Sequence, residues 1–238
     1  MKLVTSALVS HPAYLLAAAV AAYFCGCTNG AILTSRIFFH DDVRTHGSGN
    51  AGLTNFYRTY GAHYAALVGA CDMLKAVAAV GIAVWLGYRS APAFPDGLSY
   101  LPEELERIYL LRFKYWAGFF CLLGHMFPCT EKFKGGKGVL CSATMMLMLD
   151  WRIALISWGL FITLMLTTRY VSLGSVVVAL LFPLLTQLVF RDGVLTVIAA
   201  IMAALVLWAH RENIRRLFNG TENKFHFHVK APKTEGDQ

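Results

Sequence analysis

The chain has 238 residues, of which 57% are hydrophobic and only 15% are charged, and its mean hydropathy is +0.53. Soluble domains carry about 25% charged residues, so this composition excludes a soluble protein and predicts a polytopic membrane protein. The formal net charge is +7, but the basic residues border apolar segments and no nucleic-acid-recognition motif is present. We therefore expect no nucleic-acid partner.

Seven apolar segments follow one another, and most approach the roughly 20 residues that a helix needs to cross a bilayer. We predict an all-α fold, with seven transmembrane helices in a single integral-membrane domain, residues 1–238. The expected spans are residues 12–33, 61–86, 108–127, 139–149, 153–167, 173–190 and 194–210, followed by a polar tail, 211–238. Because the fourth segment is short, its helix is expected to begin inside the preceding loop. The first segment lacks a clear signal-peptide cleavage site and is interpreted as an uncleaved helix.

The distribution of Lys and Arg predicts the orientation of these helices. If the N-terminus is outside and the C-terminus is cytoplasmic, most of the Lys and Arg residues lie on cytoplasmic connections, as is usual in membrane proteins. On that same side emerge residues 34–58, the loop after the third span, the junction at residues 169–175 and the tail. The outer connections at residues 150–152 and 191–193 are short turns, and only the loop 88–107 is long. The sequence therefore predicts that the chemistry is cytoplasmic.

The first polar segment contains HGSGNAGLTNFYRTY, residues 46–60. Ser48, Asn50 and Asn55 offer hydrogen bonds to phosphoryl or carbonyl oxygens, Gly49 lets the backbone turn closely, and Arg58 can bind a phosphate with two parallel hydrogen bonds. The alternative is a glycine-rich turn whose Ser and Asn side chains cap the second helix.

The loop GHMFPCTEKFKGGKGVL, residues 124–140, alternates lysines with glycines. Glycines can turn backbone N–H groups onto an anion while a lysine supplies the charge, so this segment is interpreted as a phosphate cradle. Its candidate residues are Gly135, Gly136, Lys137 and Gly138. It is not a nucleotide-binding P-loop, because Glu131 replaces the first glycine of that motif. The alternative is an ordinary basic loop between two spans.

Two later segments add candidates at the same face. His210 and Asn213 lie three residues apart, on one helical face, and can present a donor pair to a substrate. Ser172 and Ser175 stand where a helix begins and are typical of caps.

Within the second span, Asp72 and Lys75 are also three residues apart. Charges at membrane depth are costly, so we expect a structural ion pair, the alternative being a proton or substrate path.

Several signals of other chemistry are missing. There is no GxSxG nucleophile motif, and no histidine begins an H-x4-D acyltransferase box. A covalent enzyme intermediate is therefore not expected, and catalysis should rely on positioning and charge neutralisation. The six cysteines show no metal-ligand spacing, so we expect neither a metal nor another cofactor.

The segments GSGNAGLTN, GHMFPCTEKFKGGKG, RYVSLGS and HRENIRRLFNGTEN, in this order, resemble the signature motifs of the acyl-phosphate:glycerol-3-phosphate acyltransferases, the PlsY family. The resemblance covers essentially the whole chain and implies transfer of a fatty acyl group from acyl phosphate to the 1-hydroxyl of sn-glycerol 3-phosphate. The products would be lysophosphatidic acid and inorganic phosphate, in the first step of bacterial phospholipid synthesis.

The resemblance also implies roles for individual residues. Ser48 and Asn50 would contact the acyl phosphate, Arg58 and Lys137 would neutralise phosphates, and Ser175, His210 and Asn213 would hold glycerol 3-phosphate. Family members are thought to use the substrate's own phosphate as the proton acceptor. Leu53 departs from the family pattern, in which this position is commonly small, and the outer loop 88–107 is longer than the family requires.

The resemblance places the protein in the bacterial inner membrane, with acyl phosphate, glycerol 3-phosphate and membrane lipids as its partners, and we expect a functional monomer. A competing interpretation is a transporter or exchanger of a phosphorylated metabolite. Transporters usually hold their substrate at mid-membrane between internal repeats, and no clear repeat is visible here. A non-catalytic scaffold would not require several glycine, Arg and His motifs on one face.

Overall fold

The computed structural model describes residues 12–90 and 102–226, and within these ranges every regular element is a helix. The predicted all-α fold is therefore confirmed. The helices are α2 (Pro12–Cys27), α3 (Gly30–Phe39), α4 (Leu53–Tyr60), α5 (Ala62–Arg89), α6 (Glu103–Met126), α7 (Val139–Leu149), α8 (Trp151–Thr168), α9 (Val171–Phe190), α10 (Gly193–Ala209) and α11 (Arg211–Phe218), with 3-10 turns η1 (Val43–Thr45) and η4 (Cys129–Glu131).

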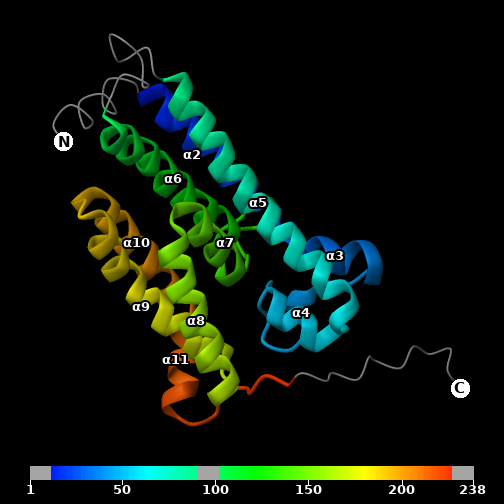
Figure 1. The fold of residues 1–238 in the computed structure, drawn as a ribbon. Coiled ribbons are helices and arrows are strands. Elements are labelled where there is room, and N and C mark those ends of the chain that lie inside the picture. The colour runs from blue at the N-terminus through cyan, green and yellow to red at the C-terminus, as the bar shows by residue number, and fades with distance from the viewer. Residues whose placement is uncertain (1–11, 91–101, 227–238) are drawn as a thin grey trace, which may run out of the picture.

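The long helices form two groups, which meet where α6 packs on α10 and through the short helix α7. Helices α2, α5 and α6 pack together, α8 and α9 pack together with α10 beside α9, and α7 lies between α5 and α8. The short helices α4 and α11 lie at the same end of the molecule (Figure 1). The polar segments singled out in the sequence thus gather at one end, as their predicted topology requires.

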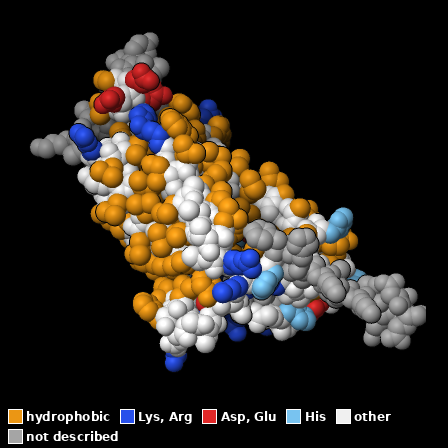
Figure 2. All heavy atoms as spheres, turned by 60° about the horizontal axis from the view of Figure 1, so that its bottom comes forward, with side chains coloured by type: hydrophobic (Ala, Val, Ile, Leu, Met, Phe, Trp, Pro, Cys, Tyr) orange, Lys and Arg blue, Asp and Glu red, His pale blue; other side chains and the backbone are white. Residues whose placement is uncertain are grey.

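The surface exposes many large hydrophobic side chains, as expected for a membrane protein. Large apolar side chains are exposed along α5, α8, α9 and α10, for example Leu74, Leu155, Leu188 and Val197. On the face drawn in Figure 2, hydrophobic side chains cover the middle and charged ones gather toward the ends. This arrangement matches a bilayer core between two polar interfaces.

By length and composition, four helices of the described residues can cross a membrane: the segment Pro12–Phe39, α5, α8 and α9. A fifth results if α10 and α11, which meet at 61°, count as one. Helix α7 has only 11 residues, and charged residues occupy the first half of α6. The seven-span count therefore stays a prediction.

Each expected span coincides with one helix or helix pair, but two local expectations are wrong. The fourth helix does not extend back beyond its apolar segment into the lysines and glycines of the loop 124–140; it starts at Val139, because Gly138 (φ +72°) turns the chain sharply there. The first helix does not end at residue 33 but breaks near Asn29, whose side chain caps α3. Helix α11 occupies the first eight residues of the polar tail. Within the loop 88–107, residues 91–101 lie outside the described ranges.

Two ion pairs lie almost fully buried among the helices. The predicted pair of Asp72 and Lys75 is confirmed, with 2.7 Å between its charged atoms. Near the opposite end of the bundle, Arg112 of α6 pairs with Asp192, the cap of α10, at 2.8 Å. Buried charges are tolerated only with such partners.

Helices α2 and α6 cross at two glycines. A Cβ atom on Gly26 would overlap the carbonyl of Cys121, and one on Gly124 would overlap the carbonyl of Tyr23. Because only glycine lets the two backbones approach this closely, the crossing fixes where α6 delivers the loop that follows it.

We predict that Gly124→Val destabilises the protein by about 3 kcal/mol, because the added side chain must force the α2 and α6 backbones apart. Thermal unfolding in detergent measures the loss. Gly159→Ala is the matched control: a Cβ at this position meets no atom within 4 Å, so its unfolding temperature should stay the same or rise slightly. Equal unfolding temperatures for Gly124→Val and wild type would contradict the close crossing.

Candidate functional site

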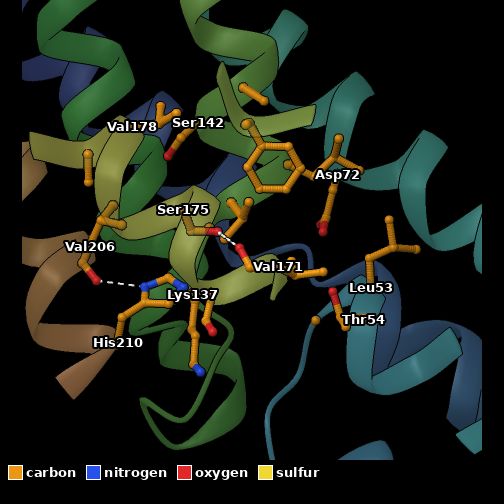
Figure 3. Close-up of a pocket in the computed structure, with 18 of the residues that line it drawn as sticks. Leu53, Thr54, Asp72, Lys137, Ser142, Val171, Ser175, Val178, Val206 and His210 are labelled. Atoms are coloured by element: carbon orange, nitrogen blue, oxygen red, sulfur yellow. Dashed lines mark hydrogen bonds between the residues drawn. The ribbon is translucent and has the colours of Figure 1, made fainter. Parts of the chain in front are cut away.

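A cavity of about 880 Å³ opens among α4, α5, α7, α8, α9, α10 and α11, at the end where the polar segments gather. One part of its lining is polar and comes from those segments. The predicted site residues in the lining are Ser48, Asn50, Asn55, Arg58, Lys137, Gly138, Ser172, Ser175, His210 and Asn213. Gly49, Gly135 and Gly136 do not line it. In Figure 3, Lys137, His210 and Ser175 face Leu53 and Thr54 across the cavity.

A hydrogen-bonded chain organises the polar part of the cavity. Lys137 donates to the side-chain oxygen of Asn213, and the amide nitrogen of Asn213 donates to Glu222 at 2.7 Å. The Glu222 carboxylate also accepts from Ser172 at 2.9 Å and from Arg216 at 2.7 Å. Glu222 thereby connects the last described segment to α9 and α11.

Positive charge exceeds negative charge at this end. Lys137, Arg58 and Arg216 line the cavity with two carboxylates, Asp72 and Glu222. Asp72 pairs with Lys75, and in the described residues only Arg216 forms an ion pair with Glu222. Burial acts to raise the pKa of Glu222, but hydrogen bonds from Asn213, Ser172 and Arg216 outweigh it and hold that pKa below its usual range.

The pKa of Lys137 shows the effect of this excess. Burial first, and then the positive charge of Arg216, lowers it from its ordinary value to about 8. Burial likewise lowers the pKa of Arg58, whose guanidinium donates to the carbonyl of Asn223 at 3.2 Å. An anion bound between these cations would remove both penalties, so the site is electrostatically suited to a phosphate.

In the first glycine-rich segment, Asn55 acts on the protein itself. Its side chain donates to the carbonyls of Val43 and His46 at 3.0 and 3.1 Å and accepts from the backbone N–H of Ser48 at 2.9 Å. All three bonds close the loop that presents Ser48. Asn55 thus lines the cavity as a scaffold of the loop, a role that sequence spacing did not indicate.

The two glycines of the second loop also differ from their predicted role. The N–H groups of Gly135 and Gly136 donate to the carbonyls of Met126 and His125 at 3.1 Å each, so neither is available to an anion. A Cβ on Gly136 would overlap the carbonyl of Ala51 and the ring of His125. These glycines are needed for close packing of the two loops.

Helix ends provide the backbone donors that the glycines do not. Helices α4, α7, α9 and α11 begin in the cavity lining, and none has a side-chain hydrogen bond at its N-cap. In contrast, Asn29, Asp150 and Asp192 cap α3, α8 and α10 with their side chains. Uncapped N-termini carry free N–H groups and partial positive charge, which favour an anion.

The sequence pattern predicted that Ser172 and Ser175 cap α9, but neither does. The N-cap is Tyr170, Ser172 donates to Glu222, and the hydroxyl of Ser175 donates to the carbonyl of Val171 at 3.0 Å. Both side chains still line the cavity.

His210 stands at the break between α10 and α11. Its Nδ1 lies 2.8 Å from the carbonyl of Val206, which can only accept, so Nδ1 carries the hydrogen (Figure 3). In the neutral ring Nε2 is then an acceptor. His210 and Asn213 do share the cavity, as their spacing predicted.

Charged side chains fasten the two loops to each other. Arg36 binds Glu131 with two hydrogen bonds of 2.7 Å each, and Arg44 donates to the Lys134 carbonyl at 3.0 Å. The side chains of Lys132 and Lys134 are exposed outside the cavity. Lys137 is therefore the one lysine of this loop that reaches the cavity.

The remaining cavity wall is mostly apolar, although Asp72, Ser142, Thr144 and Ser157 also line it. Its residues include Leu122, Met145, Met146, Leu149, Phe161, Met165, Val178, Phe182, Met202 and Val206. Methionines fill irregular space and adapt to flexible ligands. A ligand with an anionic head and a hydrocarbon chain would fit both parts of the cavity.

Sequence reasoning missed two contributors from the end of the chain. Glu222 is one, although it lay within the quoted segment HRENIRRLFNGTEN, where an acid among basic residues was the available signal. The other is Phe225, which stacks on Tyr57 with ring centroids 5.4 Å apart and donates its N–H to the carbonyl of Arg169 at 2.7 Å. This segment crosses from α4 to the start of α9 beside the polar end.

Comparison with known proteins gives a consistent family. A family model described as glycerol-3-phosphate acyltransferase matches residues 16–220. A glycerol-3-phosphate acyltransferase of Thermoanaerobacter sp. (strain X514) is 33% identical over 211 residues, covering 89% of this chain and 96% of the relative. The enzyme of the same description from Fusobacterium nucleatum is 34% identical, covering 87% and 96%. The one from Salinibacter ruber is 35% identical, covering 85% and 88%.

Two solved structures share the fold. The glycerol 3-phosphate form of PlsY (YgiH), an integral membrane glycerol 3-phosphate acyltransferase, aligns with a TM-score of 0.70 and 30% identity, over 89% of this chain and 96% of that one. The lysophosphatidic acid form aligns with a TM-score of 0.67 and 27% identity, over 89% and 95%. Together with the matching family model, these similarities show that the chain belongs to the glycerol-3-phosphate acyltransferase family of integral membrane proteins.

Proposed function

We propose that this protein transfers a fatty acyl group from acyl phosphate to the 1-hydroxyl of glycerol 3-phosphate. The observation that carries the proposal is the cavity itself, which joins a cationic end to an apolar chamber. Both substrates carry phosphate, and one of them carries a hydrocarbon chain. The family membership and the two ligand forms of PlsY support this assignment.

The cationic end would hold the phosphate groups. Lys137 and Arg58 neutralise them, the first turns of α4 and α7 donate backbone N–H groups, and Ser48 and Asn50 contact the acyl phosphate and its carbonyl. Ser175, His210 and Asn213 hold glycerol 3-phosphate. Because Nε2 of His210 is an acceptor, it can receive a hydrogen bond from a glycerol hydroxyl.

The chemical step needs no covalent enzyme intermediate. The 1-hydroxyl oxygen attacks the acyl carbonyl carbon, the new ester bond forms, and the bond between the acyl carbon and the phosphate oxygen breaks. Inorganic phosphate leaves, and the hydroxyl proton passes to a substrate phosphate, as the family resemblance implies. Lys137 and Arg58 stabilise the negative charge that develops on the leaving phosphate.

The membrane arrangement follows from the same assignment. We propose a single domain with seven spans, the N-terminus outside and the C-terminus cytoplasmic, in the inner membrane of a bacterium. The cavity then opens at the cytoplasmic interface, where water-soluble glycerol 3-phosphate is available. We propose that the protein functions as a monomer.

A transporter of phosphorylated metabolites is less well supported. Its binding site would lie at mid-membrane between halves of the bundle, whereas the cations here gather at one end, next to four helix N-termini.

The purified protein in detergent, given acyl phosphate, is expected to release inorganic phosphate only when glycerol 3-phosphate is present. Lys137→Ala should lower kcat/KM by at least about 100-fold, because a preorganised charge is lost from the site. The matched control is Lys134→Ala, which removes an exposed lysine of the same loop and should retain near wild-type activity. Wild-type protein that binds glycerol 3-phosphate without releasing phosphate would favour the transporter.

Binding of glycerol 3-phosphate should weaken as pH rises above about 8. The empty-site pKa of Lys137 is lowered to about 8 and a bound phosphate raises it, so binding takes up a proton at higher pH. The Kd, measured by calorimetry between pH 7 and 10, should rise roughly tenfold per pH unit above 8. The second pKa of a phosphate monoester is about 6, so the charge of glycerol 3-phosphate hardly changes above pH 8.

In Lys137→Arg the charge persists throughout that range, so its Kd should be nearly constant with pH. A wild-type Kd that does not change between pH 7 and 10 would show that Lys137 does not contact the phosphate.

A further inference from the structure

A second group of charged side chains lies inside the bundle beside the cavity, where Asp72 and His125 line the wall and Lys75 lies behind them. Lys75 of α5 is only 6% exposed. Its ammonium pairs with Asp72 at 2.7 Å and donates to the carbonyl of Thr28 at 2.8 Å. It also lies 2.7 Å from Nδ1 of His125, on α6. Lys75 thus joins α5 to α6 and to the break between α2 and α3.

This contact determines the tautomer of His125. An ammonium group only donates, so Nδ1 of His125 must accept from Lys75. The ring is then neutral with its hydrogen on Nε2, because an imidazolium would place a donor against a donor. Without Lys75, His125 could adopt either tautomer and could rotate.

Gly136 packs against the opposite edge of the His125 ring. The N–H of Gly136 donates to the carbonyl of His125, and a Cβ on Gly136 would overlap both Nε2 of His125 and the carbonyl of Ala51. Ala51 belongs to the first loop, where its carbonyl also accepts from Asn29 at 3.1 Å. The two loops therefore meet against the ring of His125, one residue before Lys137.

We propose that Lys75 is a positioning residue of the acyl-transfer site, acting through His125 and Gly136 on Lys137. Its ammonium fixes the His125 ring, the ring holds Gly136 against the first loop, and the loop directs Lys137 toward Asn213 and the bound phosphate. Asp72 balances the charge of Lys75 inside the membrane. The inference rests on the proposed function for its ligand, glycerol 3-phosphate.

The pair of Arg112 and Asp192 provides the matched control. It is buried to the same degree and also joins helices, but it lies away from both loops and does not line the cavity. An ion pair that only stabilises the fold changes the unfolding temperature without changing the affinity of the folded protein. Lys75→Met and Arg112→Met should therefore differ in ligand binding even where both lower thermal stability.

The test is a double-mutant cycle on the Kd of glycerol 3-phosphate, measured by calorimetry on the full-length protein in detergent at pH 7. Lys75→Met should raise this Kd roughly tenfold or more, as expected when a charged hydrogen bond is misplaced, while Arg112→Met should leave it within about twofold. In a Lys137→Gln background, Lys75→Met should add less than about threefold, because its effect passes through Lys137. If Lys75→Met raised the Kd by the same factor in the wild-type and Lys137→Gln backgrounds, or left the wild-type Kd unchanged, the proposal would be overturned.

His125→Phe provides a second route if Lys75→Met does not fold, since it preserves the ring shape and removes both nitrogens. The same rise in Kd and the same lack of additivity with Lys137→Gln are expected, and independent effects would refute the proposal. Binding does not require acyl transfer. A protein that binds glycerol 3-phosphate but releases no phosphate would contradict the proposed function, while the cycle would still decide the role of Lys75.

Discussion

The site depends on an imbalance of charge at the edge of a hydrophobic bundle. Three cations, Lys137, Arg58 and Arg216, line the cavity with Glu222, while the other lining carboxylate, Asp72, is neutralised by Lys75. Burial of the Lys137 ammonium first, and then the positive charge of Arg216, lowers the pKa of Lys137 to about 8. A bound phosphate offsets both effects. A bound anion therefore lowers the electrostatic free energy of the folded protein. In the empty site, the packing of the fold holds the cations close together.

Backbone packing provides that restraint. The glycines at the crossing of α2 and α6 deliver the second loop, and Gly136 sits where the Ala51 carbonyl and His125 meet. Outside the cavity, Arg36 and Arg44 fasten the loops through Glu131. Each loop is thus held from both sides, so that binding a phosphate requires little ordering of the protein. The apolar chamber adjoining the cations then receives the hydrocarbon chain without displacing these restraints.

The sequence predicted the helical class, the position of most helices to within a few residues and the meeting of Lys137, His210 and Asn213, because hydropathy and motif order are local properties. It did not predict that Gly135 and Gly136 give their N–H groups to α6, or that Asn55 closes its own loop. Those bonds join residues whose proximity only the packed structure creates. Glu222 was missed for the same reason, since its partners Ser172 and Asn213 come from two different helices.

The most direct test of the account is a crystal structure of the protein with glycerol 3-phosphate and a non-hydrolysable acyl phosphonate. The account predicts both phosphorus groups at the cationic end, with one oxygen within hydrogen-bond distance of Lys137 and another near the first turn of α7. It also predicts the acyl chain among Met145, Phe182 and Met202. Ligands bound at mid-membrane between helices, or phosphates that contact neither Lys137 nor Arg58, would contradict it.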